Sequence, residues 1–204
     1  MANGWPAVAL SRTGVTVLLL VAFAVPQLQG QDKYPKGEIF GGYSFSHIQD
    51  YTNSTDANLN GWGASVTGNF TRHIGLTADF SGTYGSETVF PVCVAIFPTP
   101  PGCTAQSRHL SAYNLLGGPR FSFPIHGVTP FAHALFGVAS LRRESGSQTT
   151  FAMGFGGGVD VPLGKHFSYR LFQMDYIPVK HAFNLGGWDH NVRVETGLVF
   201  RFGK

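Results

Sequence analysis

A histidine and a serine stand two positions apart at His109 and Ser111, and this spacing puts both side chains on one face of a β-strand. An imidazole beside a hydroxyl can take its proton and make the oxygen a nucleophile, so the pair is a candidate for a catalytic site. No acidic residue that would orient the imidazole is apparent, and so short a pair recurs easily by chance. The favoured prediction is therefore a protein that is not an enzyme.

Charged residues with nearly balanced signs are interspersed among small polar residues. Seven of them share the polar face of alternating segments: Glu38, Asp79, Arg120, Asp160, Arg170, Arg193 and Glu195. If that face is buried, each charge is costly unless an opposite charge and hydrogen bonds satisfy it. The pattern predicts an ion-pair network that fills the interior. A gated conduit through the same interior is the functional alternative.

Two cysteines, Cys93 and Cys103, lie ten positions apart in a segment rich in proline. In an exported chain this spacing predicts one disulfide that closes a loop, with two free thiols as the alternative. The eight histidines show neither zinc-ligand spacing relative to these cysteines nor an H-E-x-x-H pattern. We predict no metal and no other cofactor.

Period-two alternation of apolar and polar residues is the main structural signal, and it predicts β-strands. In 61–70, for example, Trp62 and Phe70 alternate with Ser65. In the segment 167–177, Arg170 and Asp175 are an odd number of positions apart, and a β-bulge between them would return both to one face. The eight predicted strands cover 38–47, 61–70, 74–84, 110–123, 129–141, 151–161, 167–177 and 191–202.

The connections between these segments alternate in length. Those at one end are short, namely 71–73, 124–128 and 162–166, whereas those at the other end are 48–60, 85–109, 142–148 and 178–190. This alternation predicts an all-β fold in which eight antiparallel strands form a meander and close into a transmembrane barrel, with short periplasmic turns and longer extracellular loops. Residues 37–204 form the barrel and 31–36 a short preceding segment.

The composition of the polar face distinguishes two kinds of barrel. A soluble, exported ligand-binding barrel has polar residues outside, whereas a membrane barrel has them inside. Only 12% of the chain is charged, while a water-facing surface usually carries about 25–35% charged residues. A polar face of Gly, Ser, Thr and Asn fits the packed lumen of an eight-stranded barrel. The membrane barrel is therefore favoured, and the slight net charge of +3 gives no support for nucleic-acid binding.

The N-terminus predicts export. Arg12 precedes the apolar run 14–25, whose length is within the roughly 7–15 residues of a secretory signal core. The run is shorter than the roughly 20 residues of a membrane helix, which disfavours a retained anchor. We predict that residues 1–30 are a signal peptide cleaved near Gly30.

On these residues the chain resembles the small bacterial outer-membrane barrels of the OmpA transmembrane-domain and OmpX type, over residues 37–204. Its most specific feature is the last-strand pattern Glu195, Gly197, Phe200 and Phe202, which in that family is the assembly signal recognised by the barrel-assembly machinery. Such recognition works by adding a strand to an exposed sheet edge. The pattern usually ends a chain on its aromatic residue, whereas residues 203–204 follow here.

The resemblance implies a bacterial outer-membrane location and a structural or surface-interaction role without enzymatic activity. Expected partners are outer-membrane lipids and lipopolysaccharide, with the barrel-assembly machinery during biogenesis, and the expected state is a monomer. The alternatives are a narrow porin-like conduit and a lipid-modifying enzyme. His109 and Ser111 look like the H-x-S pair of the lipid A deacylase barrels, although Ala112 replaces the polar neighbour of that family.

Overall fold

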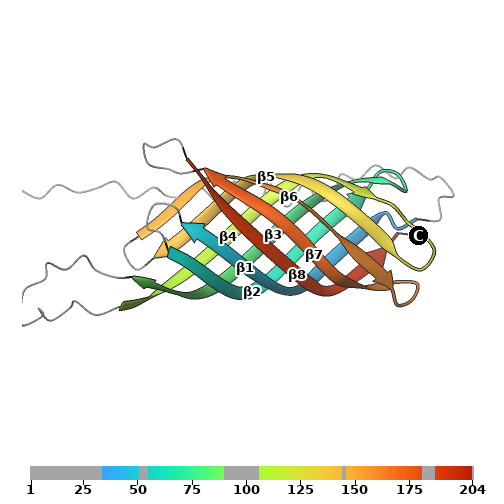
Figure 1. Cartoon of the computed structure of the whole chain (residues 1–204). Coiled ribbons are helices and arrows are strands. Elements are labelled where there is room, and N and C mark those ends of the chain that lie inside the picture. The colour runs from blue at the N-terminus through green and yellow to red at the C-terminus, as the bar shows by residue number, and fades with distance from the viewer. Residues whose placement is uncertain (1–33, 51–54, 90–105, 144–145, 181–186, 204) are drawn as a thin grey trace, which may run out of the picture. The chain divides into compact units, whose positions relative to one another are not determined.

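The computed structural model describes residues 34–50, 55–89, 106–143, 146–180 and 187–203. The strands are β1 (Gly37–Asp50), β2 (Thr55–Asn69), β3 (Ile74–Val89), β4 (Gln106–Ser122), β5 (Thr129–Arg143), β6 (Gly146–Pro162), β7 (Phe167–Lys180) and β8 (Trp188–Phe202). Each strand pairs antiparallel with the next, and β8 pairs with β1 to close the barrel (Figure 1). The predicted eight-stranded antiparallel barrel is confirmed. Among the described residues, no helix is both long and apolar enough to cross a membrane.

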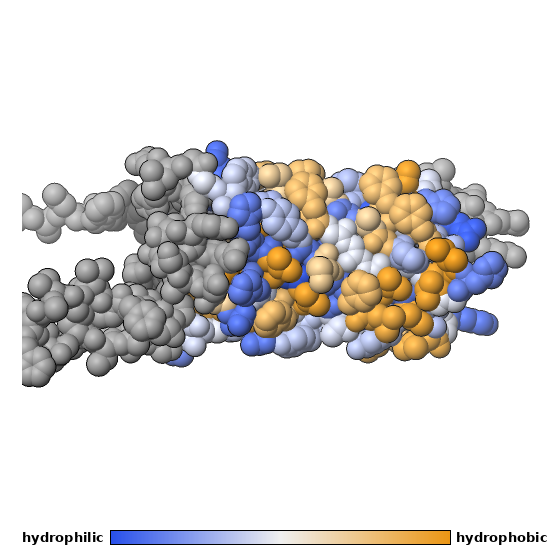
Figure 2. Space-filling model, viewed as in Figure 1, coloured by the Kyte–Doolittle hydropathy of each residue, from blue (hydrophilic) through white to orange (hydrophobic). Residues whose placement is uncertain are grey.

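Large apolar side chains lie on the outside of the barrel and small polar ones lie inside. Val66 and Leu76 are each 54% exposed, whereas Ser65, Thr67 and Thr77 are buried in the lumen. On the face shown in Figure 2, the apolar band lies toward the end that carries the C-terminus, and hydrophilic residues flank it on both sides. This inversion of the usual soluble arrangement is that of a transmembrane barrel.

Three short turns lie at the end of the barrel where β1 begins and β8 ends, which we call the turn end. In the first turn, the Thr71 hydroxyl accepts hydrogen bonds from the backbone N–H groups of His73 and Ile74 at 3.2 and 3.0 Å. In the second, Gly127 has a φ of 80°, a conformation that glycine adopts without steric cost. Tight turns of this kind bring consecutive strands together without a crossover.

At the opposite end, the loop end, the strands run well past the predicted boundaries. The predicted connection 48–60 is wrong in extent, because β1 and β2 stay paired up to Asp50 and Thr55. The predicted connections 142–148 and 178–190 shorten in the same way, to 144–145 and 181–187, and 85–109 shortens to 90–105. All four connections at this end are therefore shorter than expected, and 90–105 remains the longest of them.

The two halves of the barrel have opposite polarity, and this explains the missed boundaries. Near the loop end, Leu59 and Leu110 point inward and are almost completely buried, while Asn58 and Asn60 are exposed. The buried apolar residues form one cluster of Ala57, Leu59, Leu110 and Ala112 and another of Leu116, Leu135, Ala152 and Ile177. The interior of the loop-end half is thus partly apolar, unlike the polar lumen of the turn-end half.

Strand β7 contains the irregularity expected from its sequence. The pairing of β7 with β8 shifts between Arg170 and Gln173, since these residues pair with Gly197 and Glu195 respectively. Three steps on β7 therefore match two on β8, which is the pattern of a β-bulge. Arg170 and Asp175 are both about 1% exposed. The predicted bulge is confirmed, and it brings both charges into the lumen.

Candidate functional site in the barrel lumen

The guanidinium group of Arg193, on β8, is the centre of an ion-pair cluster halfway along the lumen. It donates hydrogen bonds to Asp79 Oδ1 at 2.7 Å and to Asp175 Oδ2 at 2.6 Å, and its Nη1 lies 3.5 Å from Glu195 Oε1. His133 Nε2 lies 2.7 Å from Asp175 Oδ1. All five side chains are buried, so the ion pairs are shielded from bulk water.

A second cluster fills the lumen nearer the turn end. Asp160 accepts hydrogen bonds from Arg120 Nη2 at 2.9 Å and from Arg170 Nε at 2.8 Å. Arg120 Nη1 also lies 3.1 Å from Glu38 Oε2, and Arg201 Nε lies 3.6 Å from Glu38 Oε1. These contacts reach from β1 through β4 and β6 to β7, and so cross the barrel.

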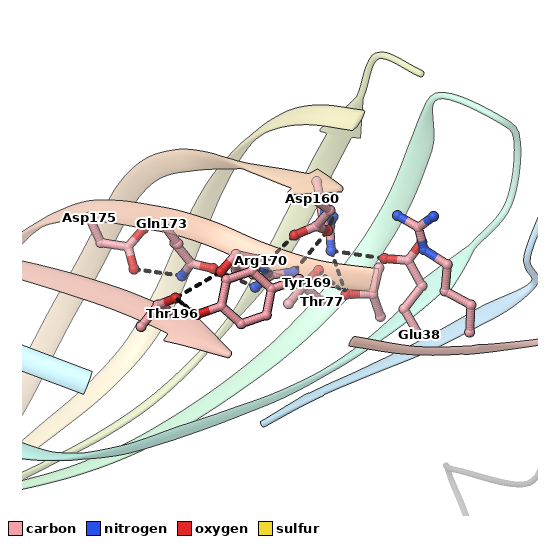
Figure 3. A network of polar contacts seen from close by, with 11 residues as sticks. Glu38, Thr77, Asp160, Tyr169, Arg170, Gln173, Asp175 and Thr196 are labelled. Atoms are coloured by element: carbon pink, nitrogen blue, oxygen red, sulfur yellow. Dashed lines mark hydrogen bonds and ion pairs between the residues drawn. The ribbon is translucent and has the colours of Figure 1, made fainter. Parts of the chain in front are cut away.

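Gln173 joins the two clusters into one network. Its Oε1 accepts from Arg170 Nη1 at 2.6 Å, and its Nε2 donates to Asp175 Oδ2 at 2.7 Å. Figure 3 shows the chain of contacts that runs from Asp160 through Arg170 and Gln173 to Asp175. The bulge makes this link possible because it places Arg170, Gln173 and Asp175 of β7 all on the lumen side.

Two phenylalanines inside the polar network contact guanidinium groups with their rings. The Phe131 ring lies 3.9 Å from the Arg120 guanidinium carbon and 4.5 Å from that of Arg170, and the Phe40 ring lies 4.3 Å from that of Arg170. A guanidinium over an aromatic face gains a cation–π attraction of roughly 0.5–2 kcal/mol. Two like charges can therefore share one carboxylate, Asp160.

The network's charge is distributed unevenly along the barrel. In the turn-end cluster three guanidinium groups face two carboxylates, whereas around Arg193 one guanidinium and one imidazole face three carboxylates. Neither carboxylate oxygen of Glu195 has a hydrogen-bond partner within the described residues. The loop-end side of the network is thus the more negative side.

The structure brings together all seven charged residues that the sequence placed on the inward face. The network also contains four residues that the sequence-based prediction did not include: Asp175, His133, Arg201 and the uncharged Gln173. The expected bulge signalled Asp175, and Arg201 has the same parity as Arg193 and Glu195. His133 lies in β5, a strand whose apolar residues leave its phase undefined, and nothing in the sequence singled out Gln173.

The catalytic candidates His109 and Ser111 lie on β4 and face away from the lumen. His109 is exposed and Ser111 is half-buried. Register places Ser111 opposite Tyr84 and Arg142, and His109 opposite Ser86. No hydrogen bond joins His109 to Ser111 among those found in the described residues, and no carboxylate there is found bonded to either. The pair is therefore not assembled as a triad in this structure.

The last strand completes the barrel. Phe200 and Phe202 are each 41% exposed on the outer face, with ring centroids 6.1 Å apart, while Glu195 points into the lumen. Gly197 pairs with Gly42 across the closing seam, where a Cβ on Gly42 would clash with the Thr196 carbonyl. The predicted disulfide between Cys93 and Cys103 and the predicted signal peptide lie outside the described residues.

Comparison with known proteins places this architecture. Neisserial surface protein A is similar with a TM-score of 0.61 and 11% identity, and the match covers 82% of this chain and 97% of that one. OprG from Pseudomonas aeruginosa is similar with a TM-score of 0.53 and 13% identity, over 85% of this chain and 98% of that one. Ail from Yersinia pestis, in complex with the heparin analogue sucrose octasulfate, is similar with a TM-score of 0.50 and 16% identity, over 83% of this chain and 99% of that one. At these identities the likeness is one of fold. No curated protein sequence matches the chain. The family model of the outer membrane protein beta-barrel domain, however, matches residues 15–202. Because that match spans nearly the whole sequence, the chain belongs to the outer membrane protein β-barrel domain family.

Proposed function

We propose that this protein is a non-enzymatic outer-membrane barrel with a closed lumen, whose role is structural or lies in surface interactions of its outward-facing loop end. The observation that carries the proposal is the buried ion-pair network. Its members come from strands all around the barrel and contact one another at 2.6–3.6 Å. A solute could pass only if several charged pairs separated inside a low-dielectric lumen, which is costly.

Conductance measurements test the closed lumen. Purified protein inserted into a planar lipid bilayer should give little or no steady current, while a general porin inserted in the same way should give large steady steps. Steady large channels from this protein would contradict the proposal and favour the narrow conduit. Because insertion must be shown independently, the same preparation should display heat-modifiable migration on a gel, the behaviour of a folded membrane barrel.

The absence of enzymatic function is part of the proposal, and it rests on the arrangement of His109 and Ser111. Both residues face outward, and the hydrogen bonds found in the described part of the chain do not join them. Mass spectrometry of lipid A from cells with and without the protein should give the same species. Loss of an acyl chain that depends on both residues would establish the lipid-modifying alternative.

Membrane insertion and biogenesis follow from the same proposal. We expect the protein to be exported with removal of residues 1–30, to be assembled through the last-strand pattern, and to remain a monomer among phospholipid and lipopolysaccharide. The exposed rings of Phe200 and Phe202 support contact with lipid. Intact mass of the membrane-extracted protein tests the cleavage site. Recovery of the protein with soluble periplasmic contents would contradict membrane insertion.

A further inference from the structure

A pocket of about 80 Å³ lies at the loop-end mouth of the lumen, beyond the Arg193 cluster. Part of its wall is aliphatic and includes Ala139, Leu141, Ile177 and Val179, which belong to or pack against the two apolar clusters. Strand β8 supplies polar residues to the same pocket, among them Asn191. The pocket is therefore amphipathic. The mouths of β-barrels are a common location for ligand sites.

One polar atom beside the pocket has no partner to account for it. Asn191 Oδ1 is buried and accepts no hydrogen bond from any described residue. Buried acceptors are almost always satisfied, and leaving one unpaired costs about 1–3 kcal/mol. A ligand with an N–H or O–H donor would satisfy this oxygen while its apolar part contacts Ile177, which pairs with Asn191 in the strand register.

The charged residues below the pocket determine whether it favours a cationic or an anionic ligand. Arg193 lines the pocket, but its guanidinium already donates to Asp79, Asp175 and Ser81. The carboxylates of Asp79 and Asp175 already outnumber Arg193, the one permanently charged cation of this cluster, so the field at the pocket floor is negative. Lys180 and Asp189, which also line the pocket, carry opposite charges and offset each other. Since fields are focused in a cavity with low-dielectric walls, a cation is favoured over an anion.

We propose that the pocket binds a small aliphatic ammonium compound, with its ammonium group near Asn191 and its carbon chain against the aliphatic wall. The network closes the lumen beneath it, so the pocket is a dead-end binding site and not a stage of a transport route. A volume of about 80 Å³ holds several water-sized groups, each needing at least roughly 10–15 Å³, which matches a chain of a few carbons.

Methyl NMR tests this site directly on the full mature protein in lipid nanodiscs. With isoleucine methyl labelling, titration with n-butylammonium should shift Ile48 and Ile177, which line the pocket, with half-saturation near 1 mM, to order of magnitude. Ile39 and Ile74 face lipid and report nonspecific partitioning, so they should not shift saturably. Butyrate, with the same chain length and the opposite charge, should bind at least about tenfold more weakly.

Two variants on one strand provide a matched control. Ala139→Leu places extra volume in the pocket and should abolish the saturable shifts, whereas Ala134→Leu, on the lipid-facing side of β5, should keep them. Both must show heat-modifiable migration. The proposal is overturned if Ile48 and Ile177 do not respond to n-butylammonium, if butyrate binds equally well, or if Ala139→Leu folds and binds as before. The first two outcomes need only the unaltered protein.

Discussion

Replacing Arg193 with methionine should be among the most damaging single changes to the lumen. The substitution keeps an unbranched side chain but removes the guanidinium that lies within 2.6–3.5 Å of Asp79, Asp175 and Glu195. Of these three carboxylates, His133 contacts Asp175 at 2.7 Å. Leaving a buried charge without its partner costs about 3–5 kcal/mol. We expect a loss of this size in the free energy of unfolding.

Urea unfolding of the protein refolded into lipid vesicles measures this loss, with heat-modifiable migration as the readout. Taking an m-value of roughly 2 kcal/mol/M, a loss of about 3–5 kcal/mol lowers the unfolding midpoint by roughly 1.5–2.5 M urea. The matched control is Arg142→Met. Arg142 is exposed, and its guanidinium lies 5.9 Å from the Tyr113 ring, so that change should cost less than about 1 kcal/mol.

A second change separates charge from packing at the Arg193 site. Adding Asp79→Asn to Arg193→Met removes one stranded carboxylate, so it should restore at least about 1 kcal/mol of stability. If Arg193→Met cost no more than Arg142→Met, the buried network would not stabilise the barrel in the way its geometry implies. If Asp79→Asn gave no recovery, the loss would come from packing alone.

Two further predictions concern the closing seam between β1 and β8. Phe202→Ala should lower the yield of assembled barrel in cells, whereas deletion of residues 203–204 should spare it; fractionation of outer membranes checks both, and the reverse outcome would show that the signal lies elsewhere. Gly42→Ala should lower the stability by about 1–3 kcal/mol, because its Cβ would clash with the Thr196 carbonyl across the seam. Gly41→Ala, where a Cβ meets nothing within 4 Å, is the control, and equal urea midpoints for the two variants would contradict the steric argument.

In the turn-end half, the sequence carries enough information to assign the face of almost every residue. Because lipid lies outside and a packed polar lumen lies inside, apolar residues face outward and polar residues face inward throughout this half. Ser65 and Thr67, for example, point inward, while Trp62 and Val66 point outward. Residues an even number of positions apart on one strand share a face, and for this reason Arg193 and Glu195 both lie in the lumen. Parity does not give contacts across the barrel. That Arg193 meets Asp79, more than a hundred residues away, depends on closure and register.

In the loop-end half, the same pattern misleads because apolar residues now face inward and polar residues outward, while the strand itself continues. Leu59 and Trp62 are both large and apolar, but they are an odd number of positions apart on the strand. Leu59 therefore points inward and Trp62 points outward. Such a phase break resembles the end of a strand. Backbone pairing does not depend on side-chain polarity, and β2 stays in register with β1 through this point. The boundaries therefore failed where the environment changed.

The phase break marks the outer limit of the lipid-facing surface. On β2 the outward residues change from Asn60 to Trp62, and on β7 the inward residues change from Asp175 to Ile177. Near this level the outward aromatics Tyr84 and Tyr113 are in ring contact, 5.9 Å apart, in the manner of an interfacial aromatic belt. Beyond it the strands enclose the two clusters of buried apolar residues. The membrane barrel is therefore the correct interpretation of the sequence, and its period-two pattern of apolar residues outside holds only along the lipid-facing part of each strand.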